Sequence, residues 1–344
     1  MGAGGAVMTR VGVGVAGYGY WGPNLTRVFN ESPQSRVVAV CDRDAARLRR
    51  VVDRYPGTWT TGSFEEMLAR PEVEAVVVAT PVSTHYKLAR AALGAGKHVL
   101  VEKPLATDVT QLRELYALAR DLKRVLMGGY TFLYSPPVVA IKKIIESGTI
   151  GELYYIDSSR VNLGLHQFDV SVLWDLGPHD LSMILYWTGE LPLWVQAVGN
   201  AYEGHGHEDV AWIGMEFPRG VYAHVHVSWI APTKLRRTTI TGGKQMILYD
   251  DLEVVEKVRI FDQGVKESDE VEARHEQTVA YRFGDIRVPR VSGAEPLAEE
   301  AGDFLGCIRS GGTPRSSEAI GLGITATLAA AEESVRRQGA RVAL

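Results

Sequence analysis

The N-terminal part of the chain alternates short apolar runs with longer stretches of helical periodicity. The apolar runs, rich in β-branched residues, are 10–16, 36–41, 75–79, 98–101 and 125–127. The helix-like stretches between them are 23–30, 44–54, 64–69, 83–93 and 109–121. Uniformly apolar strands are typical of a sheet with helices on both faces, and regular alternation builds βαβ units. The pattern therefore predicts an α/β domain with a parallel sheet over residues 1–128.

After Tyr130 the pattern changes to consecutive strands. Helices are expected at 138–146 and 176–187, and strands at 193–202, 209–217, 221–229, 236–241 and 245–249. Pro218-Arg219-Gly220 predicts a tight turn between two of these strands, and so an antiparallel hairpin. Residues 129–344 are thus expected to form an α+β domain with an open, mostly antiparallel sheet. The helical segments that begin at residue 296 are candidates to pack back on the first domain.

Composition excludes several classes of protein. The 344 residues carry a net charge of -4, so the overall basic footprint of a nucleic-acid-binding protein is absent. Two cysteines cannot build a disulfide framework or a Cys-rich zinc site, which predicts a reducing, cytoplasmic location. No apolar run approaches the ~18 residues of a membrane span. A small-molecule function is therefore expected, without nucleic acid or membrane as a partner.

A glycine-rich loop follows the first apolar run. Gly17, Gly19 and Gly22 form G-x-G-x-x-G between a strand and a helix, and Tyr18, Tyr20 and Trp21 fill the positions between them. In dinucleotide-binding loops the first glycine permits the tight turn, the second lets the backbone approach a pyrophosphate, and the third allows close helix packing. The motif predicts a Rossmann fold with a dinucleotide site, whereas the plain alternative is a glycine turn of structural use only.

The residues after the second apolar run bear on the choice of cofactor. Asp42 stands about 20 residues after Gly22, where a carboxylate accepts from the ribose hydroxyls of NAD. It would repel the extra phosphate of NADP, while Arg43 beside it could bind that phosphate or stack on adenine. We therefore expect the protein to prefer NAD and to use NADP less efficiently. The alternative interpretation of Asp42 is that it only caps the following helix.

Two further turns are expected at the binding crevice, because the carboxyl ends of parallel strands line it. The first is Thr80-Pro81, with His85 nearby, which either contacts the cofactor or packs at a helix start. The second is Glu102-Lys103-Pro104, where the Lys103 ammonium could orient a hydroxyl or stabilise an alkoxide.

Together with residues 91–104, these motifs closely resemble the Gfo/Idh/MocA oxidoreductases. Trp174-Asp175-Leu176-Gly177-Pro178-His179-Asp180 is similar to the substrate-domain motif of that family, an Asp followed four residues on by a His. The resemblance implies a Rossmann domain followed by an α/β domain whose open sheet holds substrate on one side and often forms oligomers with the other. A homodimer or homotetramer is therefore expected. On 221–229, Val225, Val227 and Trp229 share one face of the strand, and His224, His226 and Ser228 share the other. One of these faces should pack on helices and the other against a partner subunit.

The resemblance assigns Lys103, Asp175 and His179 as the catalytic residues. His179 would remove the hydroxyl proton as hydride leaves for the nicotinamide, and Lys103 would polarise the same oxygen; which of the two is the formal base stays open. An i,i+4 Asp/His pair by itself is more often a surface ion pair or a cap. Tyr130 is a candidate substrate contact. It lies in the segment after the sixth strand, where many members carry an Arg and this chain does not, so the family's contacts there cannot be copied. Arg160 and Asn162 line the sugar pocket or have structural roles.

The expected activity is a sugar dehydrogenase or ketoreductase. The Asp-Leu-Gly-Pro-His form of the motif is most similar to members that act on nucleotide-linked sugars at a ring carbon such as C3. A free polyol such as inositol is the alternative substrate, and a dinucleotide-sensing regulator without turnover is the alternative function. His205, His207, His224 and His226 could be drawn as a metal cluster, but nicotinamide chemistry needs none and we expect no metal.

Overall fold

The computed structural model describes residues 10–164, 169–204, 206–266 and 280–344. The chain divides into two compact units. Unit 1 comprises the described residues up to Tyr134 together with Ala294–Thr325, and unit 2 comprises Ser135–Gly293 and Ala326–Leu344. These bounds differ from a single cut at residue 128, because the segment Ala294–Thr325 returns to unit 1.

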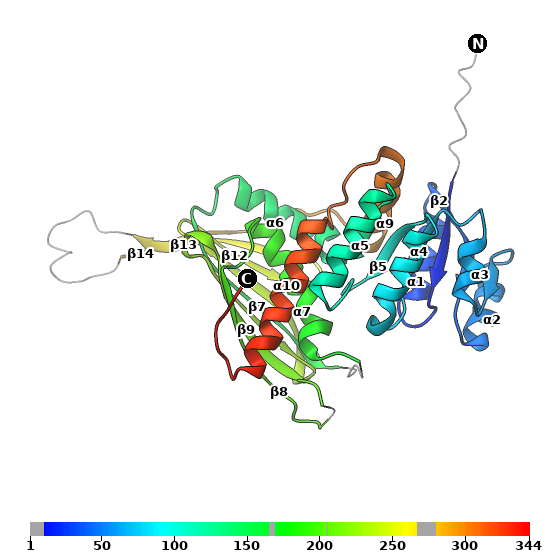
Figure 1. The fold of residues 1–344 in the computed structure, drawn as a ribbon. Helices are drawn as coiled ribbons and strands as arrows, with labels where there is room; N and C mark the ends of the chain where they lie inside the picture. The colour runs from blue at the N-terminus through cyan, green and yellow to red at the C-terminus, as the bar shows by residue number, and fades with distance from the viewer. Residues whose placement is uncertain (1–9, 165–168, 205, 267–279) are drawn as a thin grey trace, which may run out of the picture. The chain divides into compact units, whose positions relative to one another are not determined.

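Unit 1 contains a six-stranded sheet in which every neighbouring pair is parallel. The order is β3-β2-β1-β4-β5-β6, the arrangement of a doubly wound dinucleotide-binding fold. Figure 1 labels β2 and β5 of this sheet together with helices α1 to α5. The strands are β1 (Val11–Ala16), β2 (Ser35–Cys41), β3 (Trp59–Thr61), β4 (Ala75–Val78), β5 (His98–Glu102) and β6 (Leu126–Gly129). The predicted Rossmann fold is confirmed. Strand β3 was not predicted, because three residues of which two are threonine give no apolar run.

Helices cover the sheet of unit 1 and start at the expected places. They are α1 (Gly22–Glu31), α2 (Ala45–Arg54), α3 (Phe64–Ala69), α4 (His85–Gly94), α5 (Val109–Asp121) and α9 (Pro296–Ser310), with short turns η1 (Val82–Thr84) and η2 (Thr131–Tyr134). Asp108 caps α5 by accepting from the Gln111 amide at 2.9 Å. Helix α9 packs on α1, where the rings of Phe29 and Phe304 meet edge to face at 6.3 Å.

Unit 2 contains, within the described residues, a nine-stranded sheet of order β14-β13-β12-β11-β7-β10-β9-β8-β15. Its strands are β7 (Leu153–Leu163), β8 (Trp194–Asn200), β9 (Val210–Glu216), β10 (Tyr222–Ser228), β11 (Ile230–Gly242), β12 (Met246–Asp250), β13 (Val258–Lys266), β14 (Ala280–Arg287) and β15 (Val342–Ala343). Among these described strands, only the pair β7–β10 is parallel. The mostly antiparallel sheet and the hairpin at Pro218-Arg219-Gly220 are confirmed.

One face of this sheet is covered by helix α7 (Val172–Thr188), and α6 (Pro136–Glu146) packs against α7. Val225 and Val227 of β10 face α7 and are fully buried, as the alternation along the strand predicts. On the other face Trp212 and Tyr222 are exposed. Helix α10 (Glu318–Arg336) begins in unit 1 and ends in unit 2.

Helix α7 differs from the helix expected at 176–187. It begins at Val172, so Asp175 lies inside its first turn, and Pro178 lies in its interior. The helix ends at Gly189, whose φ of 71° is the left-handed conformation that glycine adopts without strain.

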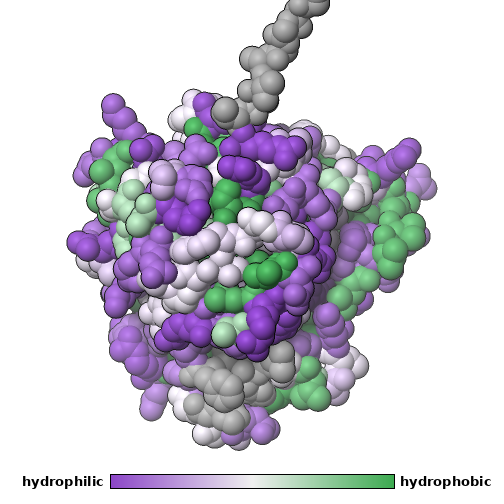
Figure 2. Space-filling view, turned by 90° about the vertical axis from the view of Figure 1, so that its right-hand side faces the viewer, coloured by the Kyte–Doolittle hydropathy of each residue, from purple (hydrophilic) through white to green (hydrophobic). Residues whose placement is uncertain are grey.

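The surface shown in Figure 2 is mostly hydrophilic, with hydrophobic patches at its centre, at its upper left and at its right-hand edge. Among the helices of the described residues, none combines the length and the apolarity that a membrane crossing requires.

Candidate active site

The glycine loop between β1 and α1 has the geometry that its motif predicts. Gly17 has a φ of +93°, and a Cβ on it would lie 2.4 Å from the Ala79 carbonyl oxygen. A Cβ on Gly22 would lie 2.2 Å from the Gly17 carbonyl oxygen. Gly19 differs, because a Cβ there would meet only the Arg47 guanidinium, at 3.7 Å. Two glycines are therefore required by the fold itself, and the middle one leaves room for a ligand.

Asp42 joins the end of β2 to this loop. Its buried carboxylate accepts from the Tyr18 amide at 2.6 Å and from the Asp44 amide at 2.8 Å. Asp44, not Asp42, caps α2, by accepting from the Ala46 amide. The alternative interpretation of Asp42 as a helix cap is therefore wrong, and its carboxylate belongs to the loop.

Arg47 is a candidate site residue that sequence reasoning missed. Its guanidinium lies 3.4 Å from Asp42 Oδ2, 3.5 Å from Asp44 Oδ2, and next to Gly19. Arg43, which we expected in this role, is exposed. The signal was available: Asp44 is a strong helix-capping residue type, and Arg47 falls in the first turn after it.

The loop supplies the features that a dinucleotide pyrophosphate needs. Helix α1 begins at Gly22 without a side-chain cap at Trp21, and its positive dipole end faces the loop. Pro23 has no N–H, and the Asn24 and Leu25 amides donate to the Trp21 carbonyl oxygen. Tyr20 and Trp21 are exposed on the loop, with their rings edge to face at 5.6 Å. With the open side of Gly19, the residues present fit a bound NAD.

The turn after β4 lies against the glycine loop. The Thr80 methyl group is 3.0 Å from the position of a Cβ on Gly17, and Pro81 is exposed. His85 is buried, with Nε2 2.8 Å from the Thr80 carbonyl oxygen and Nδ1 2.8 Å from the Pro104 carbonyl oxygen. His85 thus connects the Thr80 turn to the turn that carries Lys103, which is the packing role left open for it.

Lys103 follows β5 and is half-buried. Glu102 beside it is buried, and its carboxyl accepts from the Lys103 amide at 3.2 Å. Burial raises the pKa of Glu102 to about 7, and the charge of Lys103 opposes that rise. The Tyr130 side chain is 1% exposed, so in this structure its ring belongs to the core of unit 1.

Glu300 of α9 is a second buried carboxyl in unit 1. Its Oε2 accepts from Thr131 Oγ1 at 3.0 Å, and its Oε1 has no hydrogen-bond partner within the part of the chain that the structure describes. Burial, and next the charge of Glu102, raise the pKa of Glu300.

In unit 2, Asp175 and His179 both lie on α7, one turn apart. Asp175 Oδ2 accepts from the indole Nε1 of Trp229 at 3.1 Å, which orients the carboxylate. His179 is half-buried, and its carbonyl oxygen accepts from Ser182 Oγ at 2.7 Å. The pair therefore shares one helix face, as the spacing predicts.

Arg160 and Asn162, the two residues suggested for the sugar pocket, lie on β7. The Arg160 guanidinium is buried and pairs with Asp180 at 2.6 Å, which is the structural role left open for it. Asn162 is partly buried, and its side-chain nitrogen would be 2.6 Å from a Cβ on Gly164.

Comparison with known proteins identifies the family of the chain. The oxidoreductase family model with an NAD-binding Rossmann fold, GFO_IDH_MocA, matches residues 11–130, and the GFO/IDH/MocA C-terminal domain matches 138–248. The chain belongs to the Gfo/Idh/MocA oxidoreductase family. It is accordingly an NAD-binding enzyme of the class that oxidises or reduces CH–OH groups.

Relatives within the family act on different substrates. The trans-1,2-dihydrobenzene-1,2-diol dehydrogenase of Sus scrofa is 30% identical over 246 residues, 68% of this chain and 72% of that protein. The dTDP-3,4-didehydro-2,6-dideoxy-alpha-D-glucose 3-reductase of Actinomadura kijaniata is 34% identical over 145 residues, 42% of this chain and 43% of that protein. Another relative, an oxidoreductase of Synechocystis sp., is matched over 33% of its length.

Among solved structures, the UDP-N-acetylglucosamine 3-dehydrogenase of Acidithiobacillus ferrooxidans superposes with a TM-score of 0.79 at 26% identity. The match covers 96% of this chain and 99% of that one.

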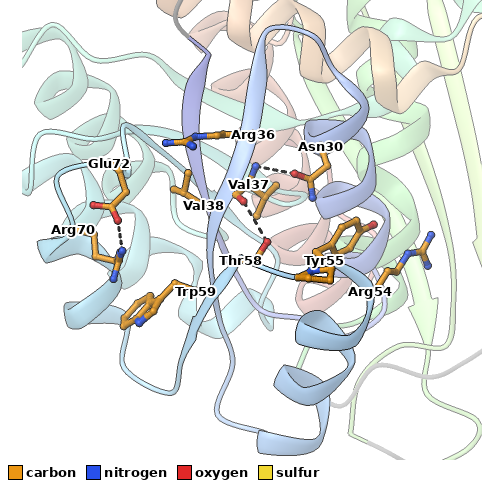
Figure 3. Close-up of a pocket in the computed structure, with 12 residues that line it drawn as sticks. Asn30, Arg36, Val37, Val38, Arg54, Tyr55, Thr58, Trp59, Arg70 and Glu72 are labelled. Carbon is orange, nitrogen blue, oxygen red and sulfur yellow. Dashed lines mark hydrogen bonds and ion pairs between the residues drawn. The ribbon is translucent and has the colours of Figure 1, made fainter.

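Two other features of this family member lie apart from the residues above. A cavity of about 540 Å³ lies beside the first residues of β2, with Arg36 and Val38 on one side of the strand and Asn30 on the other (Figure 3). The glycine loop follows the carboxyl end of β1, so this cavity is not the dinucleotide crevice. In the described residues no group of three or more His, Cys, Asp or Glu could hold a metal ion; His205 of the suggested histidine cluster lies outside them.

Proposed function

We propose that this protein transfers hydride between NAD and a ring hydroxyl or ketone of a nucleotide-linked sugar, at a carbon such as C3. The observation that carries the proposal is the Asp175/His179 pair on α7 in a chain that matches a UDP-N-acetylglucosamine 3-dehydrogenase over nearly its whole length. The dTDP-sugar 3-reductase supports the same substrate class through a shorter match.

In the proposed mechanism, NAD when bound supplies the hydride acceptor, and side chains of this chain handle the proton. His179 takes the proton of the reacting hydroxyl, because an imidazole titrates near neutral pH. Lys103 donates to the same oxygen and stabilises its developing negative charge. Trp229 donates to one oxygen of the Asp175 carboxylate, which still has lone pairs that can accept a hydrogen bond from the imidazole or from a sugar hydroxyl. In the direction of reduction His179 returns the proton.

NAD is the proposed preferred cofactor over NADP. The Asp42 carboxylate lies at the loop with its orientation fixed by the Tyr18 and Asp44 amides, so it cannot turn away from a phosphate there. A close like-charge contact costs on the order of a few kcal/mol. Arg43 and Arg47 offset part of this cost.

A cyclic diol or free polyol is the second candidate substrate. It is favoured by the dihydrobenzenediol dehydrogenase, which is matched over 72% of its length, more than the dTDP-sugar reductase. Asp175 and His179 serve either substrate class, since both reactions move one proton from a hydroxyl.

We also propose that the protein is a homodimer or homotetramer that associates through the outer face of the unit 2 sheet. Tyr155, Trp212 and Tyr222 are exposed there on neighbouring strands, and Trp212 stacks on His226 at 4.8 Å. Exposed aromatic groups on an open sheet are typical of an association surface. Light scattering tests this, and a monomer at all concentrations would contradict it.

The deciding experiment is a substrate screen read by absorbance of the reduced nicotinamide. The purified protein is mixed with NAD and, separately, UDP-N-acetylglucosamine, dTDP-glucose and myo-inositol. We expect turnover with a nucleotide-linked sugar and its loss in His179→Ala. Turnover with myo-inositol alone would support the second candidate. Binding of NAD without turnover on any alcohol would indicate a dinucleotide-sensing regulator.

A further inference from the structure

Asp180, the residue after His179, is anchored to the sheet by three hydrogen bonds. Its carboxylate is 1% exposed and accepts from Arg160 Nε at 2.6 Å, from Ser158 Oγ at 2.7 Å and from Arg160 Nη2 at 3.5 Å. Ser158 Oγ also shares a hydrogen bond of 2.8 Å with Thr238 Oγ1 of β11. We call Ser158, Arg160, Asp180 and Thr238 the Asp180 clamp. It joins α7 to the two strands β7 and β11.

Stability alone does not explain this clamp. Arg160 and Asp180 are almost completely removed from water, and the cost of desolvating two charges is comparable with their mutual attraction. Apolar residues of similar volume stabilise such positions as well or better. A buried pair of this kind is better explained by the one arrangement of α7 that it enforces.

That arrangement includes the direction of His179. Pro178 lies inside α7 and has no N–H to donate to the Trp174 carbonyl oxygen, so the helix is weakened one residue before His179. Consecutive side chains on a helix differ by about 100°, so holding Asp180 against the sheet fixes the rotation of α7 and the direction of His179. On the preceding turn Trp229 holds Asp175 in the same way.

We infer that the Asp180 clamp is a positioning device for His179, and that Arg160 acts through Asp180 instead of binding the sugar. Pro178 removes one backbone hydrogen bond from the helix just before His179. The clamp compensates for this loss by fixing the imidazole in the orientation for proton transfer. A displacement of about 1 Å at a reacting group can cost ~10²-fold in rate. The inference rests on the proposed role of His179.

The test removes the clamp without leaving a charge buried. In the double variant Arg160→Met/Asp180→Leu, Ser158 and Thr238 still bond each other, so the fold should persist with an unfolding temperature near that of the wild type. We expect kcat on the best substrate of the screen to fall ~10–10²-fold with NAD affinity unchanged. The control is Arg237→Met, which removes a guanidinium bonded to Asp250 at 2.8 Å on the opposite face of the same sheet. Because it leaves the Asp250 carboxylate buried without that guanidinium, its unfolding temperature is measured beside that of the double variant.

A second measurement does not depend on the substrate. In protein labelled with ¹⁵N-histidine, the His179 signal is identified by its loss in His179→Gln. We expect the double variant to shift or broaden this imidazole signal and the Arg237→Met control to leave it unchanged.

Two results would overturn the inference. One is an unchanged His179 signal in the double variant, and the other is an equal loss of kcat in Arg237→Met. If His179→Ala itself retains full turnover, the assigned proton relay of the proposed function fails, but the His179 signal still decides whether the clamp positions this residue.

Discussion

The glycine loop of unit 1 and the helix α7 of unit 2 place their functional groups by different physical means. In the loop, backbone contacts set the positions of the functional groups: Gly17 and Gly22 have no space for a Cβ, and the Tyr18 amide orients the Asp42 carboxylate. On α7, side chains distant in sequence set the positions of the functional groups: Trp229, just after β10, holds Asp175, and Arg160 of β7 holds Asp180. The first kind of site depends on residue types within one short motif, and the second on partners that only the tertiary structure brings together.

The largest expected effect is at α7. Replacing His179 with Ala should lower turnover by ~10²–10⁴-fold and leave NAD affinity near normal, because the proton acceptor is lost while the glycine loop is untouched. Steady-state rates and NAD titration measure the two quantities. His224→Ala is the control, since His224 pairs with Asp157 on the outer face of the sheet. Full activity in His179→Ala on the true substrate would show that the assigned proton relay is wrong.

A second prediction concerns the loop and separates its two kinds of glycine. Gly19→Ala should fold normally, because the added methyl group meets only Arg47, at 3.7 Å. It should nevertheless weaken NAD binding about tenfold or more, ~1.4 kcal/mol, because the methyl group occupies the approach to the pyrophosphate. Calorimetric titration and thermal unfolding test the two parts. Gly94→Ala, which meets nothing within 4 Å, is the control. NAD affinity at the wild-type level in Gly19→Ala would contradict the placement of the pyrophosphate beside Gly19.

The sequence predicted the architecture better than the site, for a physical reason. Strand–helix alternation and G-x-G-x-x-G are local patterns, and the parallel sheet and the loop geometry follow from them. The nine-stranded sheet was predicted only in part. The edge strand β3 lacks an apolar run, and the start of α7 at Val172 was hidden by its interior proline.

The side-chain roles were harder to predict. Arg160 is separated by 20 residues from Asp180, and Trp229 by 54 from Asp175, so neither pair shows a local spacing signal. For Arg160 a place in the sugar pocket and a structural role both stayed open, because the sequence shows only that its strand precedes the helix of Asp175 and His179. The assignments of Lys103, Asp175 and His179 as catalytic residues stay predictions until they are tested by mutation.

The third prediction concerns the specificity of the loop site. Asp42→Ser should move the ratio of kcat/KM with NADP to that with NAD upward, about tenfold, because Arg43 and Arg47 remain and the like-charge repulsion is removed. Asp44→Ser is the control, since serine also caps a helix and Asp44 lies 3.5 Å from the same Arg47. A wild-type preference for NADP, or a ratio unmoved by Asp42→Ser, would contradict the assignment of Asp42.

The smallest expected effect is a pH dependence of stability from the two buried carboxyls of unit 1. Burial raises the pKa of Glu102 to about 7, and burial with the charge of Glu102 raises the pKa of Glu300; Lys103 and Asp303 are the other charged groups that act on them. A carboxyl whose pKa is raised on folding ionises first in the unfolded chain. The folded state therefore loses stability as the pH rises from the ordinary glutamate value, about 4.3, through the folded pKa.

Glu102→Gln and Glu300→Gln should each remove part of this loss. The unfolding free energy of each variant relative to the wild type should rise between pH 5 and pH 8, by on the order of 1 kcal/mol, because an amide does not ionise. Chemical denaturation at the two pH values measures it. Glu318→Gln is the control, because Glu318 is a partly exposed partner of Arg120 and should give no such rise. A difference between variant and wild type that is the same at both pH values would mean that these carboxyls are ionised throughout, and that unit 1 tolerates two buried negative charges.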